Sequence, residues 1–139
     1  MNYVTRKVHF NAAHRLHNPE KPDEWNRKTY GKCNHPNWHG HNYTLEVTIA
    51  GEVDPETGFV IDLSRLKEII REKILEPCDH RNLNIDVPFL KGIIPSTENL
   101  AKAFYRELKE DVETAASEGA ELYSITLYET RNNSVVYKP

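Results

Sequence analysis

Residues 41–52 carry the most restrictive pattern in this chain, a regular alternation of apolar and polar side chains. Successive side chains of a strand point to opposite faces, so this period of two predicts a strand with one buried face. Residues 3–13 alternate in the same way. Two half-buried strands predict an antiparallel sheet that packs on one side. The buried rows are predicted to be Val4, Val8, Phe10 and Ala12, and Tyr43, Leu45, Val47 and Ile49.

Turn and capping residues define the next elements. The segment 54–58 (Asp-Pro-Glu-Thr-Gly) predicts a turn, because proline presets φ and glycine permits a positive φ. A short strand at Phe59–Asp62 is expected to complete a hairpin. A helix is predicted over 64–76, capped by Asp62 or Ser64 and ended by Pro77.

The C-terminal half adds a second helix and two strands. The helix is predicted to open at Pro95-Ser96-Thr97-Glu98, with Ser96 or Thr97 as its cap, and to run to about residue 111. Residues 121–130 and 134–138 predict strands joined by a turn at 131–133. This order predicts an α+β fold class, an antiparallel sheet with helices on one face.

Composition limits the class of protein. A length of 139 residues, with 38% hydrophobic and 28% charged side chains, predicts a single soluble globular domain over residues 1–139. The chain has no apolar run long enough to cross a membrane and no apolar signal segment, so a cytoplasmic protein is expected. A net charge of −3 without a basic cluster argues against nucleic acid or a membrane surface as a partner.

The histidines are the most informative polar residues. His39 and His41 flank Gly40, so in a strand both imidazoles point to one face and continue its apolar row. His14 continues the apolar row of the first strand. Three neutral imidazoles with an open fourth position match a catalytic zinc site, whereas structural zinc takes four protein ligands. The alternative, that these are ordinary polar residues at strand ends, stays open at this point.

The remaining histidines and the cysteines have simpler interpretations. His9 lies opposite the apolar row and is expected to be solvated, and His17 and His35 are expected in a loop outside the ligand set. Cys33 lies in a polar loop shortly before His39 and is either a base or nucleophile activated by a nearby cation, or a free surface thiol. Cys78 is expected to be buried or inert.

Five further residues are candidates for acid–base work or substrate binding. Asp79 and His80 place a carboxylate beside an imidazole, either as a catalytic pair or as a turn after a helix. Glu129 continues the row of Tyr123, Ile125 and Leu127, and a carboxylate there must be paired or functional. Thr97 and Glu98 are either helix caps or substrate contacts.

With these residues assembled, the chain resembles the 6-pyruvoyl-tetrahydropterin synthase family over almost its entire length. The resemblance implies a tunnelling fold with a four-stranded antiparallel sheet and two helices on one face. Three subunits would join their sheets into a barrel, and two trimers would stack into a homohexamer with active sites at subunit interfaces. The blocks that carry the resemblance are Phe10–Leu16, Gly31–Tyr43, Gly51–Gly58, Asp79–Asn84, Ser96–Leu100 and Tyr128–Thr130.

The resemblance also implies roles for the candidate residues. His14, His39 and His41 match the zinc ligands. Cys33 matches the catalytic base, with Asp79 and His80 completing the proton-transfer set. Glu129 matches the carboxylate that anchors the pterin, assisted by Thr97 and Glu98. The implied reaction converts 7,8-dihydroneopterin triphosphate to 6-pyruvoyl-tetrahydropterin with loss of triphosphate and without a redox cofactor.

Two alternatives compete with that activity. The 6-carboxytetrahydropterin synthases of the queuosine pathway share the fold, zinc site and substrate. They typically place three residues between the cysteine and the histidine pair, whereas five separate Cys33 from His39 here, which resembles the pyruvoyl type. His35 and Trp38 occupy positions that the pyruvoyl type often fills with asparagine and glycine. A non-catalytic pterin-binding scaffold is the other alternative, against which the presence of Cys33, Asp79 and His80 argues.

Overall fold

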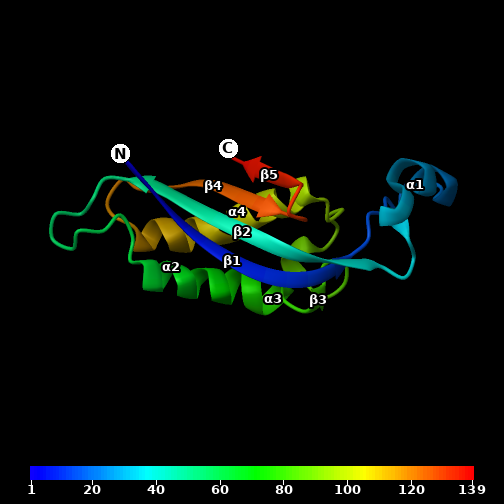
Figure 1. Ribbon diagram of the computed structural model, residues 1–139, viewed down its shortest axis with the longest axis horizontal. Helices are drawn as coiled ribbons and strands as arrows, with labels where there is room; N and C mark the ends of the chain where they lie inside the picture. The colour runs from blue at the N-terminus through cyan, green and yellow to red at the C-terminus, as the bar shows by residue number, and fades with distance from the viewer.

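Two long antiparallel strands, β1 (Asn2–His14) and β2 (His39–Gly51), lie side by side along the centre of the molecule (Figure 1). The computed structural model describes all 139 residues. β4 (Glu121–Tyr128) pairs with β2, and β5 (Ser134–Tyr137) pairs with β4, both antiparallel. The two-residue strand β3 (Arg81–Asn82) pairs in parallel with β1. The sheet order is therefore β3-β1-β2-β4-β5.

The sheet departs from the sequence-based prediction in two places. It has five strands rather than four, because β3 adds a short parallel strand at the edge of β1. The strand predicted at Phe59–Asp62 is absent. Instead Ile61 forms a single antiparallel bridge with Ala116, and Ser117 N–H donates a hydrogen bond to the Val60 carbonyl at 2.7 Å. This segment therefore packs against the chain that leaves the long helix and does not return along β2.

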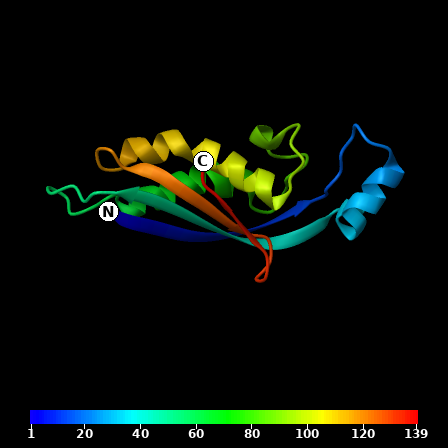
Figure 2. The same ribbon diagram turned by 90° about the horizontal axis from the view of Figure 1, so that it is seen from above.

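The helices that follow β2 lie on one face of the sheet (Figure 2). α2 (Leu63–Ile70) continues through a π-helical turn (Arg71–Leu75) into α3 (Glu76–Cys78), and α4 (Thr97–Ala115) packs beside this run. The caps are Asp62, which accepts from Ser64 N–H, and Ser96, which accepts from Asn99 N–H. Both were among the predicted caps. The first helical run ends one residue beyond Pro77, and α4 extends four residues past the predicted end at 111.

One helix was not foreseen. α1 (Asp23–Tyr30) leads into a 3-10 turn (Gly31–Asn34), and both project beyond the end of the sheet (Figure 1). The buried residue of α1 is Asn26, whose amide donates to the carbonyls of Asn18, Lys21 and Pro22. Because polar hydrogen bonds rather than an apolar stripe hold this helix, hydrophobic periodicity gave no signal for it. A further 3-10 turn covers Pro88–Leu90.

The core fills the space between the sheet and α2 and α4. The predicted rows are confirmed for Val8, Phe10 and Ala12 on β1 and for the whole β2 row from Tyr43 to Ile49. The prediction for Tyr123 was wrong. A bulge in the β2–β4 pairing between Thr48 and Ile49 turns Tyr123 to the other face, where it packs edge-on against Tyr3 at 4.8 Å. None of the helices is both long and apolar enough for a membrane span.

Candidate functional site

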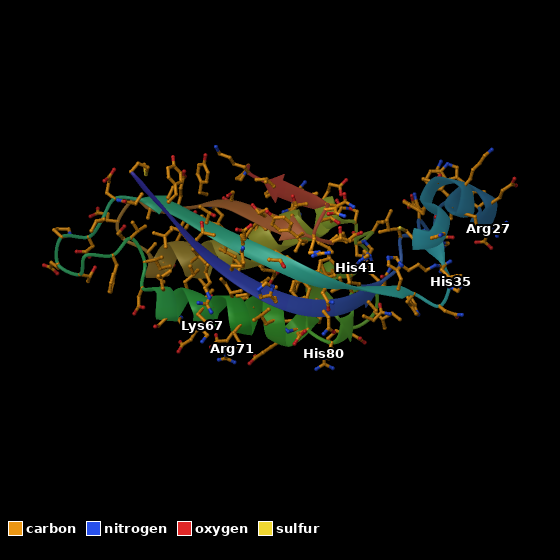
Figure 3. The ribbon with its side chains drawn as sticks, viewed as in Figure 1. Arg27, His35, His41, Lys67, Arg71 and His80 are labelled. Carbon is orange, nitrogen blue, oxygen red and sulfur yellow. The ribbon has the colours of Figure 1, made fainter.

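The three predicted metal ligands lie together at one end of the sheet. β1 and β2 pair so that His14 is opposite His39 and Ala12 is opposite His41, which places the three imidazoles on the helix-covered face. Their ring centroids are 4.6 to 5.1 Å apart, and one nitrogen from each ring lies within 4.8 Å of the others. His41 is labelled in Figure 3. The histidine cluster, as we call these three residues, could hold one metal ion.

The hydrogen bonds of the cluster are incomplete. Nε2 of His14, both ring nitrogens of His39 and Nε2 of His41 are buried without a hydrogen-bond partner. Each unpartnered buried polar atom is costly, by about 1–3 kcal/mol. A divalent cation that accepts nitrogen lone pairs would satisfy one such atom on each ring. The residues present therefore fit a metal ion.

The loop before α4 fixes the tautomer of His14. Nδ1 of His14 lies 2.9 Å from the Pro95 carbonyl oxygen and 3.3 Å from the Tyr43 hydroxyl. A carbonyl oxygen only accepts, so Nδ1 carries the hydrogen and Nε2 keeps its lone pair. A ring held this way presents Nε2 as a ligand, which is how outer hydrogen bonds orient metal-binding histidines.

Burial favours the neutral, metal-binding form of two of these rings. It lowers the pKa of His14 from 6.5 to about 4, and the neighbouring His39 and His41 add to this while the Pro95 hydrogen bond and Glu129 oppose it. Burial and His41 also lower the pKa of His39, against the opposing effect of Glu129. Neutral imidazole is the form that binds metal, so the site is ready to bind near neutral pH.

Glu129 lies beside the cluster, in the turn that follows β4. Its Oε1 is 3.4 Å from Nε2 of His41, and its Oε2 accepts a hydrogen bond from Thr97 Oγ1 at 2.7 Å. Thr97 is buried at the start of α4. The structure thus brings together Glu129, Thr97 and the three histidines, which come from four separate elements of the chain.

Asp79 and His80 form a second group near the β1 edge. Nδ1 of His80 lies 3.0 Å from Oδ1 of Asp79, which also accepts from Asn11 N–H at 3.0 Å. Nε2 of His80 is 3.5 Å from the Asn11 side-chain amide. His80 has a φ of 60°, and such left-handed non-glycine residues concentrate at functional sites. His80 and His41 both line a groove of about 610 Å³ at this end of the sheet.

Cys33 and Glu98 remain apart from these groups. Cys33 is half-buried in the 3-10 turn, where its carbonyl accepts from Leu16 N–H at 2.9 Å, and its sulfur is outside the metal-ligand group. Glu98 is exposed in the first turn of α4 and makes no side-chain hydrogen bond or ion pair. Neither side chain forms a hydrogen bond or ion pair with the histidine cluster within this one chain.

The other titratable candidates behave as expected. His9 is exposed and shares a hydrogen bond with Thr44 Oγ1 at 3.1 Å. Nδ1 of His17 accepts from the Asn34 amide at 2.9 Å. Burial raises the pKa of Cys78 to about 12, so this thiol is inert.

Three features of the site escaped sequence reasoning. The contact between Pro95 and His14 joins residues 81 positions apart and leaves no sequence signal. Trp38, directly before His39, has a φ of 69°, which a bulky residue rarely adopts. Gly40 between His39 and His41 is not required by close packing, because a Cβ there would lie 3.6 Å from the Ala12 carbonyl, an ordinary contact.

Known proteins resemble this chain over nearly its whole length. Residues 3–139 match the family model described as 6-pyruvoyl tetrahydropterin synthase. A human protein named 6-pyruvoyl tetrahydrobiopterin synthase is 44% identical over 135 residues, which cover 97% of this chain and 90% of the human one. The solved structure of the Caenorhabditis elegans 6-pyruvoyl tetrahydropterin synthase superposes with a TM-score of 0.87 at 42% identity, covering 100% of this chain and 97% of that chain.

A more distant relative carries a different name. The Bacillus subtilis protein named 6-carboxy-5,6,7,8-tetrahydropterin synthase is 27% identical over 139 residues, which cover 98% of this chain and 84% of that protein. The higher identity lies with the pyruvoyl-type relatives, over nearly the whole chain. The family-model match and these identities together establish that this chain belongs to the 6-pyruvoyl tetrahydropterin synthase family.

Proposed function

We propose that this protein converts 7,8-dihydroneopterin triphosphate to 6-pyruvoyl-tetrahydropterin, with elimination of triphosphate. The observation that carries this proposal is the histidine cluster, whose unpartnered nitrogens converge directly beside Glu129. A cation site next to a fixed carboxylate suits a substrate with side-chain hydroxyls on one end and an amino-pyrimidine ring on the other. The 44% identity to the human relative of that name supports the same reaction.

His14, His39 and His41 would hold Zn²⁺, since three imidazoles with an open position are typical of catalytic zinc. When bound, zinc supplies Lewis-acid polarisation of the substrate's side-chain hydroxyls. The protein's own contribution is orientation. The Pro95 carbonyl fixes the His14 ring, and the β1–β2 register fixes the other two rings.

Glu129 would anchor the pterin ring. The amino-pyrimidine edge presents two adjacent N–H donors, which a carboxylate can accept in a paired, charge-assisted arrangement. Thr97 donates to Oε2 of Glu129 at 2.7 Å, so the carboxylate is held in place before substrate arrives. This anchor would set which side-chain atoms of the substrate reach the histidine cluster. Glu98, exposed nearby in the first turn of α4, is proposed to assist from the same helix start.

Cys33, His80 and Asp79 would move the protons. Cys33 would remove a proton as thiolate, and His80 would relay another. Asp79 Oδ1 accepts the Nδ1 hydrogen of His80, which leaves Nε2 of that ring as the basic atom. The Asn11 amide already donates toward Nε2 at 3.5 Å, in agreement with this tautomer.

A complete site would need more than one chain. Cys33 forms no side-chain hydrogen bond with the Asp79–His80 pair and is outside the metal-ligand group of this chain. We therefore propose trimers that join their sheets into a barrel, stacked as a homohexamer, which would also close the exposed edges of β3 and β5. Mixing inactive Cys33→Ala and His41→Ala chains would restore activity if a site draws these residues from different chains. No recovery in mixed hexamers would contradict this arrangement.

Identification of the product tests the function. Purified zinc-loaded protein incubated with 7,8-dihydroneopterin triphosphate should give a pterin with the mass of 6-pyruvoyl-tetrahydropterin. Release of acetaldehyde would instead assign the carboxy reaction named for the Bacillus subtilis relative. A Cys33→Ala protein that bound pterin but turned over at the wild-type rate would remove Cys33 from the mechanism. Binding without any turnover by the wild type would favour a scaffold.

A further inference from the structure

A second cavity lies between α1, the 3-10 turn that follows it and the chain just after β1. Its volume is about 370 Å³, and apart from Pro36 its walls carry no apolar side chain. This polarity makes it a poor site for an aromatic ring. We name it the α1 cavity, and its walls include Arg15, Arg27, Lys32, His35 and Asp23.

The basic groups of this cavity lack protein partners. Nε of Arg15 donates to the Asn34 carbonyl at 2.8 Å, which fixes the guanidinium and leaves its two terminal nitrogens free. Arg27 and Lys32 make no side-chain hydrogen bond and no ion pair, although Asp23 lines the same cavity. Several exposed cations elsewhere do pair with acids, as in Arg71–Glu76, Lys73–Asp111 and Lys109–Glu113. Three cations therefore face one cavity with a single carboxylate.

His35 adds an oriented donor. Its Nδ1 accepts a hydrogen bond from Asn37 N–H at 3.1 Å. The ring hydrogen is therefore on Nε2, so His35 can donate from that atom. Guanidinium, ammonium and imidazole donors gathered in this way match the oxygens of phosphate groups, which arginine binds in paired hydrogen bonds.

The α1 cavity adjoins the candidate metal centre along the chain. Arg15 directly follows His14, and His35 and Pro36 precede His39 by four and three residues. Figure 3 shows Arg27 and His35 at the same end of the molecule, beyond His41 and far from Lys67. The net charge of the whole chain is −3, so the positive character of this cavity is local and not a general property of the surface.

We propose that the α1 cavity is a polyphosphate subsite, in which Arg15, Arg27, Lys32 and His35 bind the phosphate chain of the substrate while the pterin end lies at Glu129. This inference rests on the proposed function, because it assigns the anionic end of that same substrate. Free triphosphate, the leaving group, is then a ligand of the same subsite and competes with substrate.

Calorimetric titration of the zinc-loaded protein with sodium triphosphate tests the subsite. Arg27 is exposed and outside the proposed chemistry, so Arg27→Gln should leave the fold intact while removing one charge-assisted contact. The dissociation constant should rise about tenfold, the effect of losing one such contact. Lys67→Gln is the matched control, since it removes one exposed cation on α2 and should leave the constant unchanged. Zinc content is measured after each titration, because triphosphate also binds free zinc.

Two outcomes separate this proposal from the proposed function. If Arg27→Gln and Lys67→Gln bind triphosphate with the same affinity as the wild type, the subsite is wrong even when the wild type makes the pterin product. If binding depends on Arg27 but no product forms, the subsite stands and the reaction assignment fails. Binding of dihydroneopterin, which has no phosphate, should be equal in all three proteins. Weaker binding of dihydroneopterin by Arg27→Gln than by the wild type would also overturn the proposal.

Discussion

Nδ1 of His14 lies 2.9 Å from the carbonyl oxygen of Pro95, across 81 positions of sequence. This contact connects the end of β1 to the loop that opens α4, the helix that also carries Thr97. The histidine cluster and Glu129 therefore share one support, since Thr97 in turn holds Glu129. Changes in this loop are expected to affect both the histidine cluster and Glu129.

The metal-free protein should lose stability on acidification because of His14. Its pKa is about 4 in the fold and 6.5 in an unfolded chain, so between these values the unfolded state binds a proton that the folded state does not. Stability therefore falls as the pH drops from 6.5 to about 4, by roughly 3 kcal/mol from this residue. Urea unfolding of the metal-free protein across this range measures it. The decrease should be smaller in His14→Gln, and equal decreases in both proteins would refute the assignment.

Glu129→Gln should weaken catalysis without removing the metal. The amide keeps the size of the side chain but loses the charge and one acceptor oxygen, so the paired contact with the pterin edge is lost. A decrease in kcat/KM of roughly 10- to 100-fold is expected from the loss of a charge-assisted bond. Steady-state kinetics measures the decrease in kcat/KM, and metal analysis measures whether the zinc content is unchanged. Glu118→Gln, an exposed acid in the turn before β4, is the control. Unchanged kinetics in Glu129→Gln would remove the anchor role.

The two cysteines should differ sharply in reactivity. Cys78 is fully buried with a pKa raised to about 12, whereas Cys33 is half-buried in the 3-10 turn. The thiolate is the reactive form, so a thiol reagent should label one cysteine in the folded protein and two in urea. Mass mapping should find the label on Cys33, and activity should decline as labelling proceeds. Equal labelling rates for both cysteines in the folded protein would show that the packing around Cys78 is wrong.

Two glycines of β2 should respond differently to alanine. A Cβ at Gly51 would lie 2.5 Å from the Ala120 Cβ, which requires the chain to shift. Gly51→Ala should therefore lower the free energy of unfolding by about 1–3 kcal/mol, the usual cost of overpacking. In Gly40→Ala the nearest atom to the new Cβ is at an ordinary contact distance. This variant should therefore keep both the wild-type free energy of unfolding and the wild-type metal content. Denaturant titrations of the two variants make the comparison, and similar losses in both would contradict the packing at Gly51.

The sequence predicted the parts of the fold that alternation and capping control. The rows ending at His14 and beginning at His41 follow from a period of two, and both helix caps follow from local hydrogen bonding. The features that the sequence did not predict depend on contacts between residues distant in sequence or on side-chain hydrogen bonds. β3 is too short for a pattern, the bulge beside Tyr123 depends on the β2–β4 register, and α1 is held by the amide of Asn26.

The candidate site also has a part that the local sequence pattern predicts and a part that depends on contacts distant in sequence. The convergence of the three histidines could be expected from their strand positions, because antiparallel pairing brings His14 opposite His39. The position of Glu129 next to His41 could be predicted from the sequence only in part. Glu129 continues the row of Ile125 and Leu127 as expected, but the bulge removes Tyr123 from that row. The support from Pro95 and the separation of Cys33 from the cluster could not be read from the chain. They result from loops whose paths are set by tertiary packing.

We propose that three imidazoles on one face of β1 and β2 hold a metal ion. Metal analysis of the purified protein examines this ligand set by comparing the wild type with His41→Ala and with the exposed control His9→Ala. We expect about one zinc per chain in the wild type and in His9→Ala, and loss of most of the zinc in His41→Ala. Full zinc occupancy in His41→Ala, or none in a wild type supplied with zinc, would contradict it.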